Sequence, residues 1–153
     1  MTERVPLTIL KNLIHNETYT RQVLPFIQPD YFEERIDRIV FEEISKFLDK
    51  YDKTPTKEVL HIEVEKRVDV TEEEYKSVEQ LISALDTGES ESKWLLDTTE
   101  EWCKSRAIYL ALIKSIQIAD GQDEHKKPEA IPNILSDALA VGFDLIKPYS
   151  ECI

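Results

Sequence analysis

The stretch DRIVFEEISKFLDKYDKTPTKEVL, residues 37–60, decides the fold class. Apolar side chains recur in it at steps of three or four, which is the spacing of one face of an α-helix. They are Ile39, Val40, Phe41, Ile44, Phe47 and Leu48. A stripe this broad is typical of the central helix of a small bundle. We therefore predict a helix over residues 34–53, ended by the segment KTPT, and place these six residues in the core.

The composition extends this prediction to the whole chain. The 153 residues include only three glycines, and 41% of them are hydrophobic. Sparse glycine together with abundant Lys, Glu, Leu and Ile favours helices throughout. We predict an all-α protein, a small multi-helix globular bundle followed by a long αα-hairpin.

Shorter helices are predicted on either side of the central one. The apolar spacing indicates helices over residues 5–15 and 19–27, and a further helix starts near Thr54 or Thr56. Within it, VLHIEV also alternates as a strand would, but the glycine-poor surroundings and the lack of a partner strand favour a helix. Thr71 and Glu74 form the pattern of a capping box, which marks the start of the next helix.

A polar break at TGESES separates this bundle from a different second part. We predict a bundle subdomain over residues 1–88 and a dimerisation subdomain over residues 89–153. Residues 92–119 contain no proline or glycine, and a second helix is predicted over 131–146, so the two form an αα-hairpin. The hairpin has more apolar positions than one packed face can cover, so it needs a partner, either the bundle or another subunit. We assign to a subunit interface Trp94, Trp102, Tyr109, Ile113, Leu135, Leu139 and Phe143.

The charge and the hydropathy restrict the environment and the partners. A net charge of −12 opposes direct tight binding to nucleic acid and favours a protein partner with a basic face. No apolar run approaches the ~20 residues that a membrane span requires, and the start of the chain lacks the core of a signal peptide. Cys103 and Cys152 match no metal or redox spacing. We expect two free thiols and a cytoplasmic protein.

Catalytic and metal-binding patterns are not found in the sequence. There is no phosphate-binding loop, so we expect no ATPase activity of this chain. His15, His61 and His125 lie in separate segments, and the E-x-x-H pattern at Glu58–His61 occurs once where a carboxylate-bridged metal site needs it twice. We predict no catalytic, cofactor or metal site. The acid pairs 33–34, 42–43 and 100–101 are expected to be solvated helix surface.

The order of these segments resembles the N-terminal domain of DnaB-type replicative DNA helicases, and most of all that of the T-even-like bacteriophages. The third helix of the bacterial family carries a pattern like His-Arg-x-Ile-Phe, which stands here as Asp37-Arg38-Ile39-Val40-Phe41, with Asp37 in place of the histidine. Upstream, the DYF segment at residues 30–32 resembles an Asp-x-Phe turn of the family. WLLDTTEEWCKSRAIYLAL and AIPNILSDALAVGFD resemble the two hairpin helices of the phage branch.

The resemblance implies a role in DNA replication without chemistry in this chain. In the family, a RecA-like motor that uses ATP and Mg follows this domain, and we expect the gene to continue past Ile153 into it. The domain forms a collar on the hexamer, in which hairpins pair as a trimer of dimers and primase docks to complete a primosome. The resemblance implies that Arg38 braces the bundle. It also places the protein in the bacterial host cytoplasm if it is phage-encoded.

Two alternative functions remain. One is a free-standing helical adaptor, similar to a helicase loader, and the other is a helical-bundle metalloenzyme, which would bind metal stoichiometrically. A reading frame that continues into a phosphate loop would favour the helicase reading over the adaptor.

Overall fold

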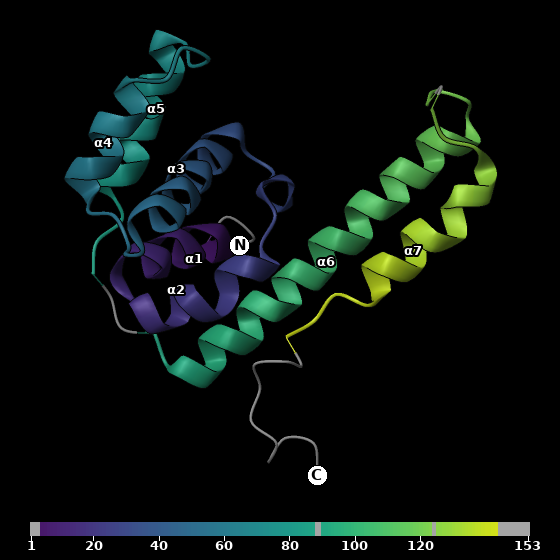
Figure 1. Ribbon diagram of the computed structural model, residues 1–153, viewed down its shortest axis with the longest axis horizontal. Helices are drawn as coiled ribbons and strands as arrows, with labels where there is room; N and C mark the ends of the chain where they lie inside the picture. Colours follow the sequence, from purple (N-terminus) through teal and green to yellow (C-terminus); the bar gives the residue numbers. More distant parts are fainter. Residues whose placement is uncertain (1–3, 88–89, 124, 144–153) are drawn as a thin grey trace.

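The computed structural model describes residues 4–87, 90–123 and 125–143, and every regular element in these ranges is a helix. The prediction of an all-α protein is therefore confirmed. A bundle of short helices packs against one end of a long helix, and the rest of that helix projects from the bundle as one arm of a hairpin (Figure 1). The bundle elements are α1 (Arg4–His15), α2 (Glu17–Val23), η1 (Leu24–Phe26), η2 (Pro29–Tyr31), α3 (Arg35–Tyr51), α4 (Lys57–Glu65) and α5 (Glu72–Ser83). The hairpin elements are α6 (Ser92–Ala119), η3 (Pro128–Ala130) and α7 (Ile131–Leu139).

Helix α3 is the centre of the bundle, because it contacts α1, α4, α5 and η2. Four of its predicted core residues are fully buried, namely Ile39, Val40, Phe41 and Ile44. The Phe41 ring packs on Phe32, with 5.2 Å between centroids. Phe47 and Leu48 are only half-buried, since the last turn of α3 extends past the helices that cover its middle.

The polar residues of the first turn of α3 link it to the preceding turn. Arg38 Nη1 donates to the carbonyl oxygen of Phe32 at 3.2 Å, which is a bracing contact. Burial raises the pKa of Asp37 to about 6, with the nearby charge of Glu34 adding to the effect. At this position the chain thus has a partly desolvated acid where the bacterial pattern has histidine.

Helices α4 and α5 pair with each other and pack on α3. The segment VLHIEV lies in α4 and is helical, as predicted. The capping box is also present: the Thr71 side chain accepts from Glu74 N–H, and the Glu74 carboxylate accepts from Thr71 N–H. The acid pair at residues 42–43 differs from the prediction, because Glu43 is buried instead of solvated. Arg67 Nη1 donates to the Glu43 carboxylate at 2.8 Å, and this partner satisfies the buried charge.

The first half of α6 belongs to the same core as the bundle. Leu95 and Cys103 are fully buried in the cluster that also contains residues of α1, α2 and α3. A buried hydrogen bond of 2.7 Å joins Tyr19 Oη of α2 to Thr99 Oγ1 of α6, and Arg106 Nε donates to the Tyr31 carbonyl of η2. The predicted subdomain boundary at residue 88 lies outside the described residues and stays a prediction.

Helix α7 is shorter than predicted, since it ends at Leu139 and not at Ile146. The chain leaves the helix at Ala140, and Phe143 then turns inward to pack on Phe26, with 5.1 Å between ring centroids. Residues 144–146 of the predicted helix lie outside the described residues.

The burial of Phe41 leads to a first prediction. Phe41→Ala should lower the free energy of unfolding by about 3–5 kcal/mol, because it leaves a cavity among fully buried neighbours. Tyr51→Ala is the matched control, since Tyr51 is an exposed aromatic residue on the same helix, and its loss should cost under about 1 kcal/mol. Thermal or urea unfolding of the two variants measures the difference. Equal losses would show that the register of α3 is wrong.

Candidate functional site

The candidate site is the α6–α7 hairpin, whose distal half projects from the bundle (Figure 1). Helix α7 runs antiparallel along this half of α6. The α6 positions under it are small and recur every fourth residue: Ala107, Ala111 and Ser115 are all buried. Small side chains on one face let a neighbouring helix approach closely. Helix α7 therefore covers one face of distal α6 and leaves the opposite face without a covering element among the described residues.

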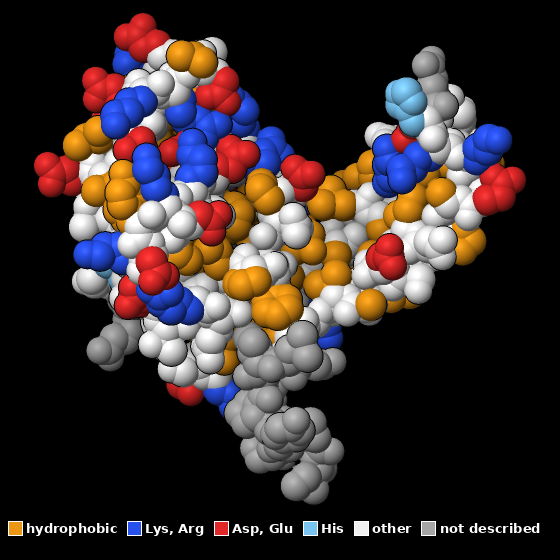
Figure 2. Space-filling view, in the orientation of Figure 1, with side chains coloured by type: hydrophobic (Ala, Val, Ile, Leu, Met, Phe, Trp, Pro, Cys, Tyr) orange, Lys and Arg blue, Asp and Glu red, His pale blue; other side chains and the backbone are white. Residues whose placement is uncertain are grey.

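The uncovered face carries a row of side chains, most of them large and apolar, that we call the α6 stripe. It consists of Trp94, Thr98, Trp102, Ser105, Tyr109, Leu112 and Ile116. At about 100° per residue these positions fall within roughly 80° of one another and on nearly the opposite side from Ala107 and Ala111. Their exposed members retain large accessible fractions: Trp94 51%, Tyr109 48%, Leu112 48% and Ile116 60%. Hydrophobic side chains gather along α6 in the hollow between the bundle and the hairpin (Figure 2).

A groove of about 610 Å³ adjoins the middle of the α6 stripe. One wall is α6, with Trp102 and Tyr109, and the other is formed by the start of α1 and the η2 turn. The Trp102 ring is half-buried because it packs on Phe32 and on Tyr31, with centroid distances of 4.8 and 6.0 Å. The Arg106 guanidinium lies over the Tyr109 ring at 5.0 Å, so this exposed tyrosine is held in place. The groove is thus a preformed surface with aromatic walls.

The predicted interface residues fall into three groups. Three are exposed: Trp94, Tyr109 and Leu139. Three are half-buried: Trp102, Ile113 and Leu135. Phe143 is fully buried against its own chain, and a partner could not reach it without rearrangement, so we no longer include it in the interface. The sequence list omitted Leu112 and Ile116, which projection of α6 onto a helical wheel would have found.

A buried carboxylate connects the end of the hairpin to the middle of α6. Glu100, which we expected to be solvated, is buried, and its Oε2 accepts from the Phe143 N–H at 2.7 Å. The Lys104 ammonium lies 3.9 Å from the same oxygen. Gly142 passes close to this carboxylate: an added Cβ would lie 3.3 Å from Oε2, so a larger residue here would require a small shift of the Glu100 side chain. The return of the chain after α7 is therefore fixed by Glu100.

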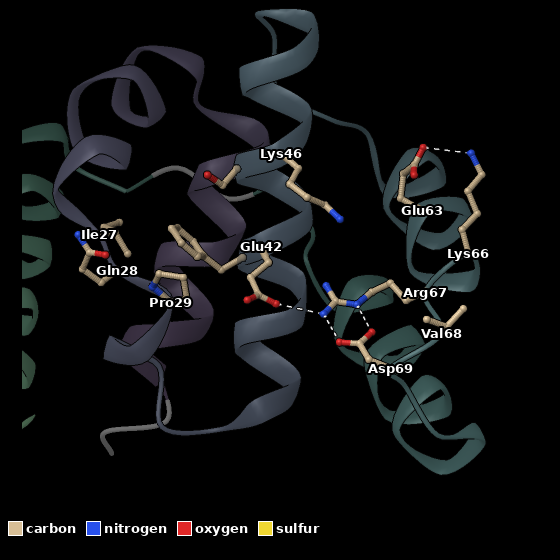
Figure 3. A pocket seen from close by; sticks show the side chains of 12 residues that line it. Ile27, Gln28, Pro29, Glu42, Lys46, Glu63, Lys66, Arg67, Val68 and Asp69 are labelled. Atoms are coloured by element: carbon tan, nitrogen blue, oxygen red, sulfur yellow. Dashed lines mark hydrogen bonds and ion pairs between the residues drawn. The ribbon is translucent and has the colours of Figure 1, made fainter. Parts of the chain in front are cut away.

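A second cavity, of about 730 Å³, lies between η2, α3 and the α4–α5 pair (Figure 3). Its cations are already paired: Lys46 with Glu43, Lys66 with Glu63, and Arg67 with Glu42, Glu43 and Asp69. The Arg67 guanidinium lowers the pKa of Asp69 to about 2, and the hydrogen bonds that Arg67 donates to Asp69 and then to the two glutamates raise the pKa of Arg67. This network clamps α3 to the α4–α5 pair. With its positive charge neutralised, the cavity is not suited to capture an anion.

Other chemistry-bearing groups do not converge. In residues 4–87, 90–123 and 125–143, no three His, Cys, Asp or Glu side chains come together in a way that could hold a metal ion. His61, from the E-x-x-H pattern, faces Glu79 at 3.6 Å. Burial raises the pKa of the Cys103 thiol to about 12, and the Glu100 charge adds to this, so Cys103 is a poor nucleophile. Cys152 lies outside the described residues. None of the described helices is long and apolar enough to span a membrane.

The role of Glu100 can be tested by hydrogen exchange. Glu100→Ala removes the acceptor of the Phe143 N–H, so exchange at that amide should accelerate while exchange in α3 stays unchanged. Glu100→Gln keeps an acceptor oxygen and should give an intermediate rate. Residue-resolved amide exchange measures both. An unchanged rate at Phe143 in the alanine variant would mean that Glu100 does not hold the return of the chain.

No protein-family model matches the chain. The chain is similar to a DnaB-like replicative helicase of Enterobacteria phage T4, with 31% identity over 144 residues that cover 89% of this chain. The match takes in 30% of the length of that helicase, so the chain spans under a third of the relative. The resemblance to the DnaB-like replicative helicases is thus confirmed, and it extends over nearly the whole chain. The chain matches a fragment of such a helicase, which is consistent with an N-terminal domain.

Proposed function

We propose that this chain is a non-catalytic assembly domain of a hexameric replicative helicase, the part that forms its collar and pairs subunits through the hairpin. The observation that carries the proposal is the α6 stripe, whose exposed side chains no described part of the chain covers, in a chain similar to a fragment of a replicative helicase. Exposed apolar patches of more than a few hundred Å² are typical of interaction surfaces. Motor chemistry, with ATP and Mg, would belong to another part of the helicase.

The preorganisation of the stripe supports a role in binding. The part of α6 next to the bundle is held by the Tyr19–Thr99 hydrogen bond and by Arg106. The half of α6 that projects from the bundle packs on α7. A surface that is rigid before it binds loses little conformational entropy on association. Large aromatic residues such as Trp94 and Tyr109 are common centres of binding energy. The hairpin is therefore suited to hold two subunits in a fixed geometry.

Docking of a primase is the second part of the proposal. It is supported by the family resemblance and by the net charge of −12, which favours a partner with a basic face. Co-sedimentation of the chain with a primase of the same replication system tests this part. A complex that weakens as salt is raised is expected, and the lack of any complex at low salt would remove primase docking from the proposal without affecting subunit pairing.

Subunit pairing should be visible in sedimentation over a wide range of protein concentration. We expect a dimer that forms as the concentration rises. Tyr109→Ala should raise the dissociation constant roughly 30-fold, which corresponds to the ~2 kcal/mol typical of a truncated aromatic centre. Closure into a full ring is not expected for this chain alone, since each subunit carries a charge of −12.

The matched control is Gln117→Ala, an exposed position on the same helix that lies outside the α6 stripe. It should leave the dissociation constant unchanged. A chain that stays monomeric at the highest concentration would contradict self-association through the hairpin. Equal effects of the two substitutions would move the contact away from the stripe.

A further inference from the structure

The groove beside the α6 stripe combines aromatic walls with uncompensated negative charge. Tyr31, Trp102 and Tyr109 line it, together with the carboxylates of Glu33 and Glu101. Both glutamates are exposed, and neither carboxylate forms an ion pair or a hydrogen bond within the part of the chain that the structure describes. The cavity of Figure 3 differs in this respect, because its carboxylates and cations neutralise one another. The groove is therefore the one of the two that can attract a cation.

Arg106 also lines the groove, and its charge has to be counted. Its Nε donates to the Tyr31 carbonyl oxygen, and its guanidinium lies over the Tyr109 ring at 5.0 Å from the centroid. Two carboxylates thus stand against one guanidinium, so the net charge of the described lining remains negative. The same contact shows which ligand group these walls suit. A guanidinium stacks on an aromatic ring while its N–H groups donate to oxygen atoms beside it.

We propose that the groove binds an arginine side chain of a partner protein, presented by a segment with apolar residues on both sides of that arginine. The faces of aromatic rings attract cations, and tryptophan does so most strongly. The planar guanidinium can stack on Trp102 and donate to the carboxylate of Glu33 or Glu101. A groove of about 610 Å³ takes a ligand larger than one side chain. The half-buried Val5 and Pro6 of its second wall provide the contact for the apolar neighbours of the arginine.

Binding in the groove has a consequence for the assembly of subunits. The groove and the α6 stripe share Trp102, Ser105 and Tyr109. A segment bound in the groove covers these residues, so another subunit cannot pack on them at the same time. The two binding events therefore oppose each other, and each weakens the other by the same factor. This competition rests on the proposed subunit pairing, whereas the binding of the arginine segment does not.

Fluorescence of Trp102 tests the binding site. In the full chain with Trp94→Phe, Trp102 is the only tryptophan, and it lines the groove. The probe is the peptide acetyl-Leu-Arg-Leu-amide, added at a protein concentration too low for pairing. We expect a saturable change in fluorescence that weakens as salt is raised. The same peptide with citrulline keeps the shape of arginine but has no charge, so it should bind at least about tenfold more weakly.

Substitutions of the two acids locate the contact. Glu33→Gln together with Glu101→Gln should raise the dissociation constant of the arginine peptide about tenfold. The matched control is Glu58→Gln together with Glu129→Gln, which removes the same charge at exposed positions outside the groove and should leave the constant within about twofold. All four positions are exposed, so circular dichroism of both double variants should match that of the parent.

Three results would overturn the arginine site: no response to the arginine peptide, equal binding of the citrulline peptide, or equal losses in the two double variants. Sedimentation of the unsubstituted chain with saturating arginine peptide then tests the competition, and we expect the peptide to shift dimer to monomer. A dimer that persists with the groove occupied would overturn the competition and leave the site in place. A chain that is monomeric without peptide would contradict the proposed pairing, while the fluorescence titration still decides whether the site exists.

Discussion

The fold depends on one helix that is packed by different partners along its length. The first half of α6 lies in the bundle core, where Leu95, Thr99 and Cys103 are fully buried. Beyond the contact of Arg106 with η2, its second half packs on α7 and η3, which cover one face. A helix of 28 residues is ~42 Å long, which exceeds what a bundle of such short helices can enclose. The uncovered stripe follows from this mismatch in length.

Buried polar contacts hold the two halves in one geometry. The Tyr19–Thr99 hydrogen bond and the Glu100 carboxylate lie one residue apart on α6, and they bind α2 on one side and the chain after α7 on the other. An unpaired carboxylate in this position would be costly to bury, so the contact is specific as well as stabilising. The same principle applies at Glu43, where Arg67 fixes the α4–α5 pair on α3. The rigid hairpin that the proposed pairing needs is a consequence of these contacts.

The helices and their caps could largely be predicted from the sequence, whereas contacts between distant segments could not. The run without proline or glycine predicted the bounds of α6 correctly, and the Thr71–Glu74 pattern predicted the capping box, because these features depend on neighbours in the chain. The end of α7 and the burial of Phe143 could not be predicted, since both depend on Phe26, which is far away in sequence. The burial of Glu43 and Glu100 was missed for the same reason. The sequence pattern predicts that a carboxylate on a helix is exposed, unless its partner from a distant part of the chain is known. Trp102 was assigned to an interface, yet its ring packs on Tyr31 and Phe32 of its own chain.

The central claim is that the α6 stripe is covered by a second copy, and Trp94 reports on it most directly because half of its side chain is exposed in the single chain. In a Trp102→Phe background, Trp94 is the only tryptophan of the protein. The measurement is acrylamide quenching of its fluorescence as a function of protein concentration. The account predicts that quenching weakens as concentration rises, in step with dimer formation. Quenching that stays equally strong at every concentration would contradict it.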